Sequence, residues 1–187
     1  KTIQAFLESV FNQSQKPDEI IIVDGGSTDR TVSKVKNVKL KVKSYNLKFK
    51  VLIKPGNRSI GRNEAIRETT GEVIAVSDVG CLLDKDWLKN ITQPLKDDPE
   101  VEVVAGYYRP VTKSIFEKCL AAYTCVMPDK VNPANFLPSS RSVAFKKSAW
   151  EKVGGYPENL NTCEDLIFAQ KMKKVGLRDV TVFVKGI

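Results

Sequence analysis

Two short apolar runs, each leading into an aspartate, most strongly constrain how this 187-residue chain can fold. The first run, residues 20–23 (IIIV), ends at Asp24, and the second, residues 73–76 (VIAV), is followed closely by Asp78. Runs of this length and composition predict buried strands. In an open parallel sheet, ligands bind beyond the carboxyl ends of the strands. We therefore expect Asp24 and Asp78 to face one crevice.

Helical and strand patterns alternate along the chain. A helix is expected to start near Thr28, with Ser27 as its N-cap. A separate helix, at residues 57–70, is expected to end with Gly71 as its C-cap. Further helices are expected at residues 2–13, 57–70, 84–96, 113–126, 147–153 and 163–175. Strands are expected at residues 19–24, 48–53, 72–77, 101–108, 142–145 and 179–184, with 38–46 left unassigned. This alternation predicts one α/β domain, residues 1–187, built on an open parallel or mixed sheet with helices on both faces.

The composition excludes several classes of catalytic site. The chain has no histidine, which rules out a Ser-His-Asp triad and a His-ligated zinc, so acid–base chemistry must fall to carboxylates or other groups. The four cysteines have no C-x-x-C spacing, and we expect them to be reduced and buried, as in a cytoplasmic protein. No apolar stretch approaches the roughly 20 residues of a membrane span.

The net charge of +8 has more than one interpretation. Lysines are dense between Lys34 and Lys54, where they could form a solvated face. They could also attract an anionic membrane surface or a phosphorylated substrate. Binding of nucleic acid is disfavoured, because aromatic residues are sparse in this region and no nucleic-acid motif is present.

The two aspartates lie in acidic motifs that also have purely structural interpretations. In residues 23–29 (VDGGSTD), Asp24 could stabilise a strand-to-helix turn, or it could reach a nucleotide while the glycines let backbone approach the ligand. In residues 77–81 (SDVGC), Gly80 could supply a positive φ in a turn. Alternatively, Asp78 could be an oxygen ligand for Mg²⁺ or Mn²⁺ bridging phosphates.

A third acidic motif follows near the end of the chain. Residues 154–158 (GGYPE) precede Glu164 and Asp165. The stretch from Thr162 to Asp165 is similar to a capping box, in which Asp165 would only satisfy a backbone amide. The functional interpretation places a carboxylate at the start of a helix, facing the crevice, as a general base.

The order and spacing of these motifs, with residues 61–66 (GRNEAI) between the first two, resemble the family 2 glycosyltransferases. The resemblance covers nearly the whole chain. It implies a Rossmann-like GT-A fold, a nucleotide-sugar donor and transfer of the sugar with inversion at the anomeric carbon. It also implies roles for particular residues: Asp165 as catalytic base with Glu164 beside it, donor binding by Asp24, Gly25, Arg58, Arg62 and Asp78, and a divalent Mg²⁺ or Mn²⁺ ion at Asp78.

The sequence departs from the family pattern in three places. The family's first strand is absent, and the helical pattern starts at once, so we expect a piece of a longer protein truncated at both ends. Gly25 replaces an aspartate that can read uracil, and Gly80 replaces the second aspartate of the Asp-X-Asp metal motif. A basic side chain such as Arg58 or Arg62 could neutralise the diphosphate in place of a metal.

These departures leave an alternative function open: a catalytically inactive nucleotide- or sugar-binding domain of the same fold. A nucleotidyltransferase with a similar sheet is disfavoured by the GGYPE motif and the Glu164-Asp165 pair. The acceptor side is expected within residues 113–138, the least patterned part of the chain. A glycan or lipid-linked acceptor and association with a membrane surface are the partners we expect, without nucleic acid.

Overall fold

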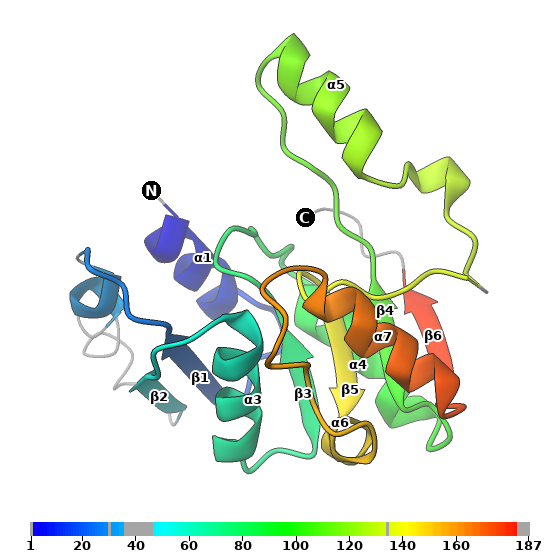
Figure 1. Ribbon diagram of the computed structural model, residues 1–187, viewed down its shortest axis with the longest axis horizontal. Helices are drawn as coiled ribbons and strands as arrows, with labels where there is room; N and C mark the ends of the chain where they lie inside the picture. The colour runs from blue at the N-terminus through cyan, green and yellow to red at the C-terminus, as the bar shows by residue number, and fades with distance from the viewer. Residues whose placement is uncertain (1, 30, 36–46, 134, 183–187) are drawn as a thin grey trace.

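The computed structural model describes residues 2–29, 31–35, 47–133 and 135–182 (Figure 1). Residues 183–187 at the end of the expected last strand, and 38–46, lie outside this part. The described helices are α1 (Thr2–Phe11), α3 (Arg58–Glu68), α4 (Trp87–Asp97), α5 (Ile115–Thr124), α6 (Lys147–Lys152) and α7 (Glu164–Lys174), with a short helical stretch at 31–35 and a 3₁₀ turn at Pro128–Lys130. The described strands are β1 (Glu19–Asp24), β2 (Lys48–Ile53), β3 (Val73–Val76), β4 (Val103–Gly106), β5 (Val143–Lys146) and β6 (Asp179–Val182).

The strands form two open sheets. In the first, β1 and β2 are parallel, and Asp24 lies opposite Ile53 at their carboxyl ends. The second has the order β3-β5-β4-β6, in which β5 is antiparallel to both of its neighbours and β6 is parallel to β4. The expectation of a mixed α/β fold is confirmed.

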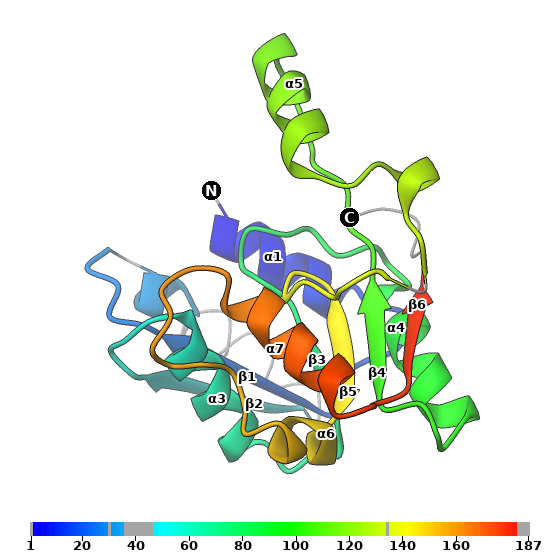
Figure 2. The same cartoon turned by 45° about the vertical axis from the view of Figure 1, so that its right-hand side comes forward.

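Helices cover both faces of the four-stranded sheet, because alternate residues of its strands point to opposite sides. On β4, Val104 packs with the apolar faces of α1 and α4, whereas Val103 packs with α3, α6 and α7. On β5, Ala144 packs on the side of α1 and α4, and Phe145 packs on the side of α3, α6 and α7. Both views of the ribbon show α7 across one face and α4 behind the sheet (Figures 1 and 2). The helices on both faces follow from this alternation of buried residues.

The two sheets do not join through the described strands. In that part of the chain β1 pairs only with β2, and β3 only with β5. A cavity of about 590 Å³ lies between them, and its lining includes residues of β1 and β3. Val23 and Gly25 at the carboxyl end of β1 and Asp78 after β3 line this cavity, whereas Asp24, which was expected to share a crevice with Asp78, is not among its lining residues.

Two expected helix caps are wrong. Helix α3 ends at Thr69, whose φ of −79° and ψ of 143° are extended, so Gly71 is not its C-cap. Just past the end of the helix, the Thr69 hydroxyl and the Thr70 amide both donate hydrogen bonds to Glu19 Oε2, at 2.6 and 2.9 Å. The helix after the first motif is in place at Thr31, whose amide donates to Asp29 Oδ1 at 2.9 Å. Asp29, rather than Ser27, fills the capping role.

The cysteines are free, as expected, but they are not buried. Cys119 and Cys163 are exposed, and Cys81 and Cys125 are half-buried. Cys119 is exposed because it lies on α5, which stands apart from the sheets (Figure 1). In the part of the chain that the structure describes, no helix is long and apolar enough to cross a membrane.

Candidate active site

The first motif forms the turn that its structural interpretation predicted. Asp24 Oδ1 accepts hydrogen bonds from the amides of Gly26 and Ser27, at 3.0 and 2.7 Å. Hydrogen bonding by Ser27, through its side chain above all, holds the pKa of Asp24 below its ordinary value although burial opposes this. Asp24 is therefore an ionised carboxylate at the carboxyl end of β1, with one oxygen committed to the turn.

Gly25 allows two backbones to approach closely beside this turn. A Cβ atom at Gly25 would lie 3.1 Å from the carbonyl oxygen of Gly56, in the segment that leads into α3. That distance is tighter than an ordinary van der Waals contact. The first motif is thereby held next to the start of α3.

The start of α3 connects this region to the third motif. Asn57 is the N-cap, and its Oδ1 accepts a hydrogen bond from the Ile60 amide at 3.1 Å. Its Nδ2 donates to the carbonyl oxygens of Glu158 and Leu160, at 2.7 and 3.1 Å. One asparagine therefore both starts the helix and holds the end of GGYPE together with the segment that follows it.

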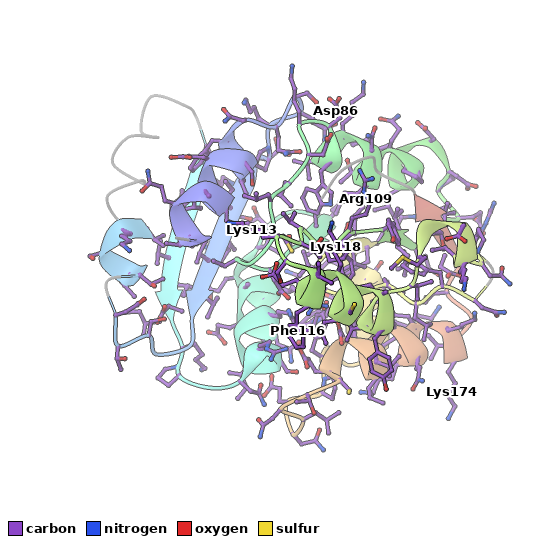
Figure 3. The ribbon with its side chains drawn as sticks, turned by 90° about the horizontal axis from the view of Figure 1, so that it is seen from above. Asp86, Arg109, Lys113, Phe116, Lys118 and Lys174 are labelled. Carbon is purple, nitrogen blue, oxygen red and sulfur yellow. The ribbon has the colours of Figure 1, made fainter. Side chains whose placement is uncertain are left out.

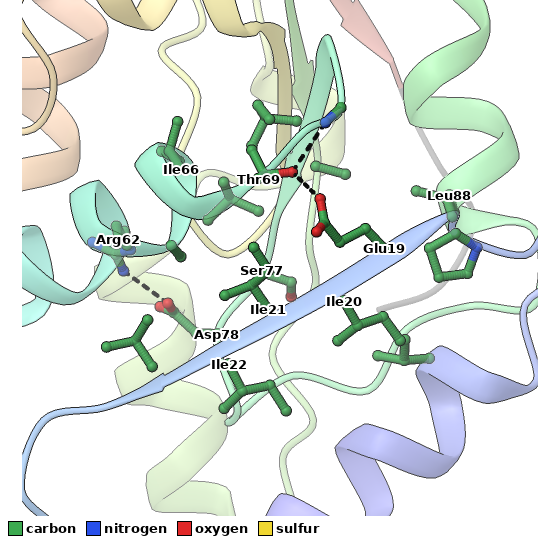
Figure 4. Close-up of a pocket in the computed structure, with 18 of the residues that line it drawn as sticks. Glu19, Ile20, Ile21, Ile22, Arg62, Ile66, Thr69, Ser77, Asp78 and Leu88 are labelled. Atoms are coloured by element: carbon green, nitrogen blue, oxygen red, sulfur yellow. Dashed lines mark hydrogen bonds and ion pairs between the residues drawn. The ribbon is translucent and has the colours of Figure 1, made fainter. Parts of the chain in front are cut away.

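Arg62, one turn into α3, joins the second motif to the third. Its Nη2 donates to Asp78 Oδ1 at 2.7 Å, and its Nη1 donates to Glu164 Oε1 at 2.8 Å. The side chains of Arg62 and Glu164 are only 11% and 3% exposed, against 36% for Asp78. Burial alone would lower the pKa of Arg62, but the ion pair with Asp78 outweighs it, so the pKa is raised and the cation is permanent. Figure 4 shows the Arg62–Asp78 pair at one end of the cavity.

Arg58 lies one turn earlier and is far more open to solvent. Its side chain is 64% exposed, and its Nη1 is 3.5 Å from Glu164 Oε1. With Gly25, Arg62 and Asp78 it lines the cavity between the sheets. Four of the predicted donor-binding residues therefore border one space, whereas Asp24, Glu164 and Asp165 do not line it.

Glu164 and Asp165 occupy the start of α7 and differ in their surroundings. Glu164 is buried, and among the described residues its Oε2 has no hydrogen-bond partner. Asp165 is half-buried: its Oδ2 accepts from the Ser139 hydroxyl at 3.0 Å and its Oδ1 from the Leu166 amide at 2.9 Å. The helix is capped at Cys163 without a side-chain hydrogen bond, so the capping box at Thr162, the structural alternative for this motif, does not form.

Asn63 is a site residue that the sequence interpretation missed. This buried side chain accepts hydrogen bonds from Trp150 Nε1 and the Tyr156 amide, and donates to the Tyr156 carbonyl and to Glu158 Oε1, all within 2.8–3.0 Å. Asn63 therefore holds the GGYPE loop against α3. The signal was present in residues 61–66, where a polar residue stands at a helix position that faces the core.

The tyrosine of that loop carries the network toward Asp165. The Tyr156 ring lies under the Arg62 guanidinium, 5.4 Å from centroid to Cζ, and its hydroxyl is 3.1 Å from Ser140 Oγ. Full burial raises the pKa of Tyr156, so it remains a neutral phenol. Ser139, the residue before Ser140, binds Asp165. A continuous set of contacts thus runs from Asp78 to the start of α7.

The donor set for a divalent cation is small. Asp78 supplies one carboxylate, one oxygen of which already binds Arg62, and Gly80 supplies none. Within the described ranges no group of three Asp, Glu, Cys or His side chains could hold a metal. Mg²⁺ is commonly bound by one or two carboxylates together with substrate phosphates. Asp78 fits such a cation only if the ligand's phosphates complete the coordination.

Gly80 does not have the backbone conformation expected of a turn glycine. It is not among the described glycines with positive φ, and a Cβ atom there would meet no atom within 4 Å. The turn expected after the strand is present, since the Cys81 amide donates to the Asp78 carbonyl at 2.9 Å, but the positive φ expected of Gly80 is wrong. An L-residue can be accommodated at this position.

The family is identified by comparison with known proteins. Residues 1–151 match the sequence model of Glycosyl transferase family 2. The chain therefore belongs to the family 2 glycosyltransferases.

Individual relatives agree with this assignment. The chain is 26% identical to the O-antigen chain rhamnosyltransferase RfbN of Salmonella typhimurium, over 92% of this chain and 57% of the relative. It is 26% identical to the poly-beta-1,6-N-acetyl-D-glucosamine synthase of Staphylococcus epidermidis, over 92% of this chain and 42% of that protein. The chain thus spans about half the length of the curated relatives it matches.

A solved structure supports the fold. The mannosyltransferase PcManGT from Pyrobaculum calidifontis, in complex with GDP-Man and Mn²⁺, superposes with a TM-score of 0.72 at 26% identity, covering 96% of this chain and 50% of that one. The mixed α/β architecture with open sheets therefore matches that of GT-A glycosyltransferases.

Proposed function

We propose that the chain is the catalytic part of an inverting glycosyltransferase, which transfers a sugar from a nucleotide-sugar donor to an acceptor hydroxyl. The observation that supports this most is the bridge from Asp78 through Arg62 to Glu164, because it links the donor side of the cavity to the start of α7. Residues 1–187 would form a single glycosyltransferase domain.

The proposed reaction is a single displacement. The acceptor oxygen attacks the anomeric carbon from the face opposite the nucleoside diphosphate, and the bond from that carbon to the diphosphate oxygen breaks. Asp165 takes the proton of the acceptor hydroxyl as the new bond forms, and Ser139 orients its carboxylate. General-base catalysis of this kind contributes typically about 10²–10⁴-fold.

The donor would bind where β1 and β3 end. Asp24 and Gly25 would hold the nucleoside, and the exposed guanidinium of Arg58 would meet the diphosphate, where negative charge develops. Arg62 already binds two carboxylates. We therefore assign it to fixing Asp78 and Glu164 rather than to a direct contact with the phosphates.

Asp78 would hold Mg²⁺ or Mn²⁺ together with the donor's phosphates. Such a cation supplies electrostatic stabilisation of the departing diphosphate. The Mn²⁺ present with GDP-Man in PcManGT supports this assignment. Gly80 limits the protein's contribution to one carboxylate, so we expect the cation to bind weakly without a nucleotide.

The acceptor would be a glycan or a lipid-linked glycan. The rhamnosyltransferase RfbN is named for an O-antigen chain, and the Staphylococcus epidermidis relative for a polysaccharide product. The net charge of +8 suits an acceptor carried at an anionic membrane surface, with the domain on the cytoplasmic side. No nucleic-acid partner is proposed.

The fold would be the GT-A fold without the family's first strand. The cavity between β1 and β3 supports this, because a strand placed there would join the two sheets into one. A crystal structure of the domain with a longer leading segment tests the proposal. A strand between β1 and β3 is expected, and direct pairing of β1 with β3 would contradict it.

Asp165→Asn tests the catalytic assignment. Against a panel of nucleotide-sugars, with and without Mn²⁺, wild type is expected to hydrolyse or transfer one donor, and the variant to lose roughly 10²–10⁴-fold in turnover. Its donor affinity, measured by calorimetry, should remain. Asp179→Asn makes the same change at an exposed residue of β6 and should retain activity.

Two results would decide against this proposal. Wild-type turnover in Asp165→Asn would remove the residue from the role of base. Donor binding by the wild type with no hydrolysis or transfer of any donor would favour the alternative, a nucleotide- or sugar-binding domain.

A further inference from the structure

Helix α5 exposes large apolar side chains that the rest of the described chain leaves uncovered. In Figures 1 and 2, α5 stands away from both sheets. Ile115, Phe116 and Tyr123 are 80%, 76% and 90% exposed, and Leu120 is 50% exposed, whereas only Ala121 is buried. Exposed apolar patches of this kind commonly mark an interaction surface.

The exposed apolar residues share one face of the helix. With 3.6 residues per turn, successive side chains are rotated by about 100°, which places Ile115, Phe116 and Tyr123 within a stripe roughly 140° wide. Cys119 and Leu120 fall within the same stripe. Ala121 lies on the opposite side, so the stripe points away from the sheets. We call this surface the α5 stripe.

Basic residues flank the α5 stripe. Residues 109–130 contain four cations, Arg109, Lys113, Lys118 and Lys130, against two acids. All four cations are exposed. Figure 3, which looks down on the projecting helix, shows Lys113, Phe116 and Lys118 at its outer surface. One of the two acids, Glu117, is tied into the capping box with Ser114.

We propose that the α5 stripe docks on a lipid bilayer that carries anionic headgroups. An amphipathic helix with an apolar face and flanking lysines lies in the plane of the membrane interface, with its apolar face buried and its charges on the phosphates. At ten residues α5 is too short to cross a bilayer, so it would lie on the surface. This inference rests on the membrane-surface association proposed above and assigns it to a defined element.

A second copy of the chain is a weaker occupant of the same surface. The α5 stripe offers a handful of side chains from one helix, whereas a stable protein interface uses roughly 20–30 residues on each side. The positive charge around the stripe would also repel an identical copy. An anionic bilayer complements both the shape and the charge.

Docking in this way would bring a membrane-bound acceptor toward the candidate base. The segment that follows α5 leads to Ser139, whose hydroxyl binds Asp165 Oδ2. The base of the projection is fixed by Tyr107, whose hydroxyl donates to the Val126 carbonyl at 2.8 Å. Residues 125–138 therefore join α5 to Ser139, which binds the candidate base.

Vesicle co-sedimentation tests the proposal with the purified 187-residue chain. Vesicles of equal parts phosphatidylglycerol and phosphatidylcholine should bind the wild type, and vesicles of phosphatidylcholine alone should bind it much less. The double variant Phe116→Ser/Tyr123→Ser should bind the anionic vesicles about tenfold more weakly, or weaker still. Lys113→Gln with Lys118→Gln should lower it roughly 30-fold, at about fivefold per lysine, and added salt should weaken the wild type.

Matched controls separate the α5 stripe from general surface effects. Lys174→Gln and Val175→Ser change an exposed lysine and an exposed apolar residue at the end of α7, and both should bind vesicles as the wild type does. Figure 3 shows Lys174 well away from α5. Circular dichroism of each variant verifies that it is folded.

Three outcomes would overturn the inference. These are equal loss in the α7 controls, no preference for anionic vesicles, and a dimer by sedimentation velocity that the Phe116 and Tyr123 changes dissociate. Asp165→Asn should bind vesicles normally, because docking does not use the base. Failure of vesicle binding with donor turnover intact would reject the docking alone, and the converse would reject the catalytic proposal alone.

Discussion

Arg62 binds Asp78 through a hydrogen-bonded ion pair of 2.7 Å, and with its other terminal nitrogen it binds Glu164 at 2.8 Å. The three residues come from α3, the turn after β3 and the start of α7. Glu164 is almost wholly buried, and a buried carboxylate without a cation is costly. Arg62 thus forms ion pairs with two carboxylates that the fold brings to one place.

Replacing Arg62 by methionine should destabilise the protein by about 3 kcal/mol or more, because the buried Glu164 would keep only the exposed Arg58, 3.5 Å away, as a cationic partner. Chemical denaturation measures this change. Arg67→Met is the matched control: its side chain is 53% exposed and its ion pairs should contribute at most about 1 kcal/mol. Adding Glu164→Gln to Arg62→Met should recover part of the loss. Equal effects of the two arginine substitutions would contradict the assignment.

The sequence predicted the elements that carry this site more reliably than the contacts between them. Residues 20–23 and 73–76 have the composition of buried strands, and the structure confirms both as strands, although of these eight residues only Ile74 is buried. A strand that ends in an aspartate indicates which edge of a sheet that residue occupies. It does not indicate that an arginine on α3 will bind it, because that contact depends on how a helix packs across the sheet.

A substitution at Gly80 tests whether a cation binds at Asp78. Gly80→Asp should restore a second carboxylate next to Asp78 without strain, because φ is not positive there and a Cβ atom would meet nothing within 4 Å. Adding ligand charge strengthens the binding of hard cations. Calorimetry with Mn²⁺ in the presence of UDP or GDP should show binding tightened by about tenfold or more.

Gly80→Asn is the control for this change, since it has nearly the same size and no charge. It should leave Mn²⁺ affinity close to that of the wild type. If the aspartate and asparagine variants bind Mn²⁺ equally, residue 80 does not face the cation and Asp78 is not the metal-binding residue we propose.

The GGYPE loop allows steric and conformational effects to be separated. Gly154 and Gly155 have φ values of 73° and 74°, in the left-handed region that disfavours L-residues. A Cβ atom at Gly154 would meet nothing, whereas one at Gly155 would lie 2.9 Å from Asn63 Oδ1. Gly154→Ala should therefore cost roughly 1–2 kcal/mol of stability, and Gly155→Ala clearly more. Equal melting temperatures for the two variants would show that Asn63 does not hold the loop as described.

Asn63 also illustrates why part of the site was not predicted. A buried asparagine in a helix is ordinarily unfavourable, so its position in residues 61–66 gave no indication of its partners. Its four hydrogen bonds join α3 to residues that lie 87 to 95 positions further along the chain. Such partners depend on the packed arrangement of α3, α6 and the loop. Conversely, the turn at Asp24 was predictable, because its partners lie two and three residues along the chain.

The turn at Asp24 predicts a particular dependence of stability on pH. The pKa of Asp24 is lowered in the folded protein by Ser27, so the folded state binds a proton less readily than the unfolded chain does. The resulting stabilisation is fully present above the unfolded pKa of about 4 and is lost as pH falls through the lower folded value. The free energy of unfolding of wild type should therefore decline between about pH 5 and pH 2. Asp24→Asn keeps an acceptor for the Gly26 and Ser27 amides but cannot titrate, so its decline should be shallower by up to about one proton. Urea denaturation across this range measures the two slopes, and parallel curves would show that the Asp24 carboxylate is not held in its charged form by the turn.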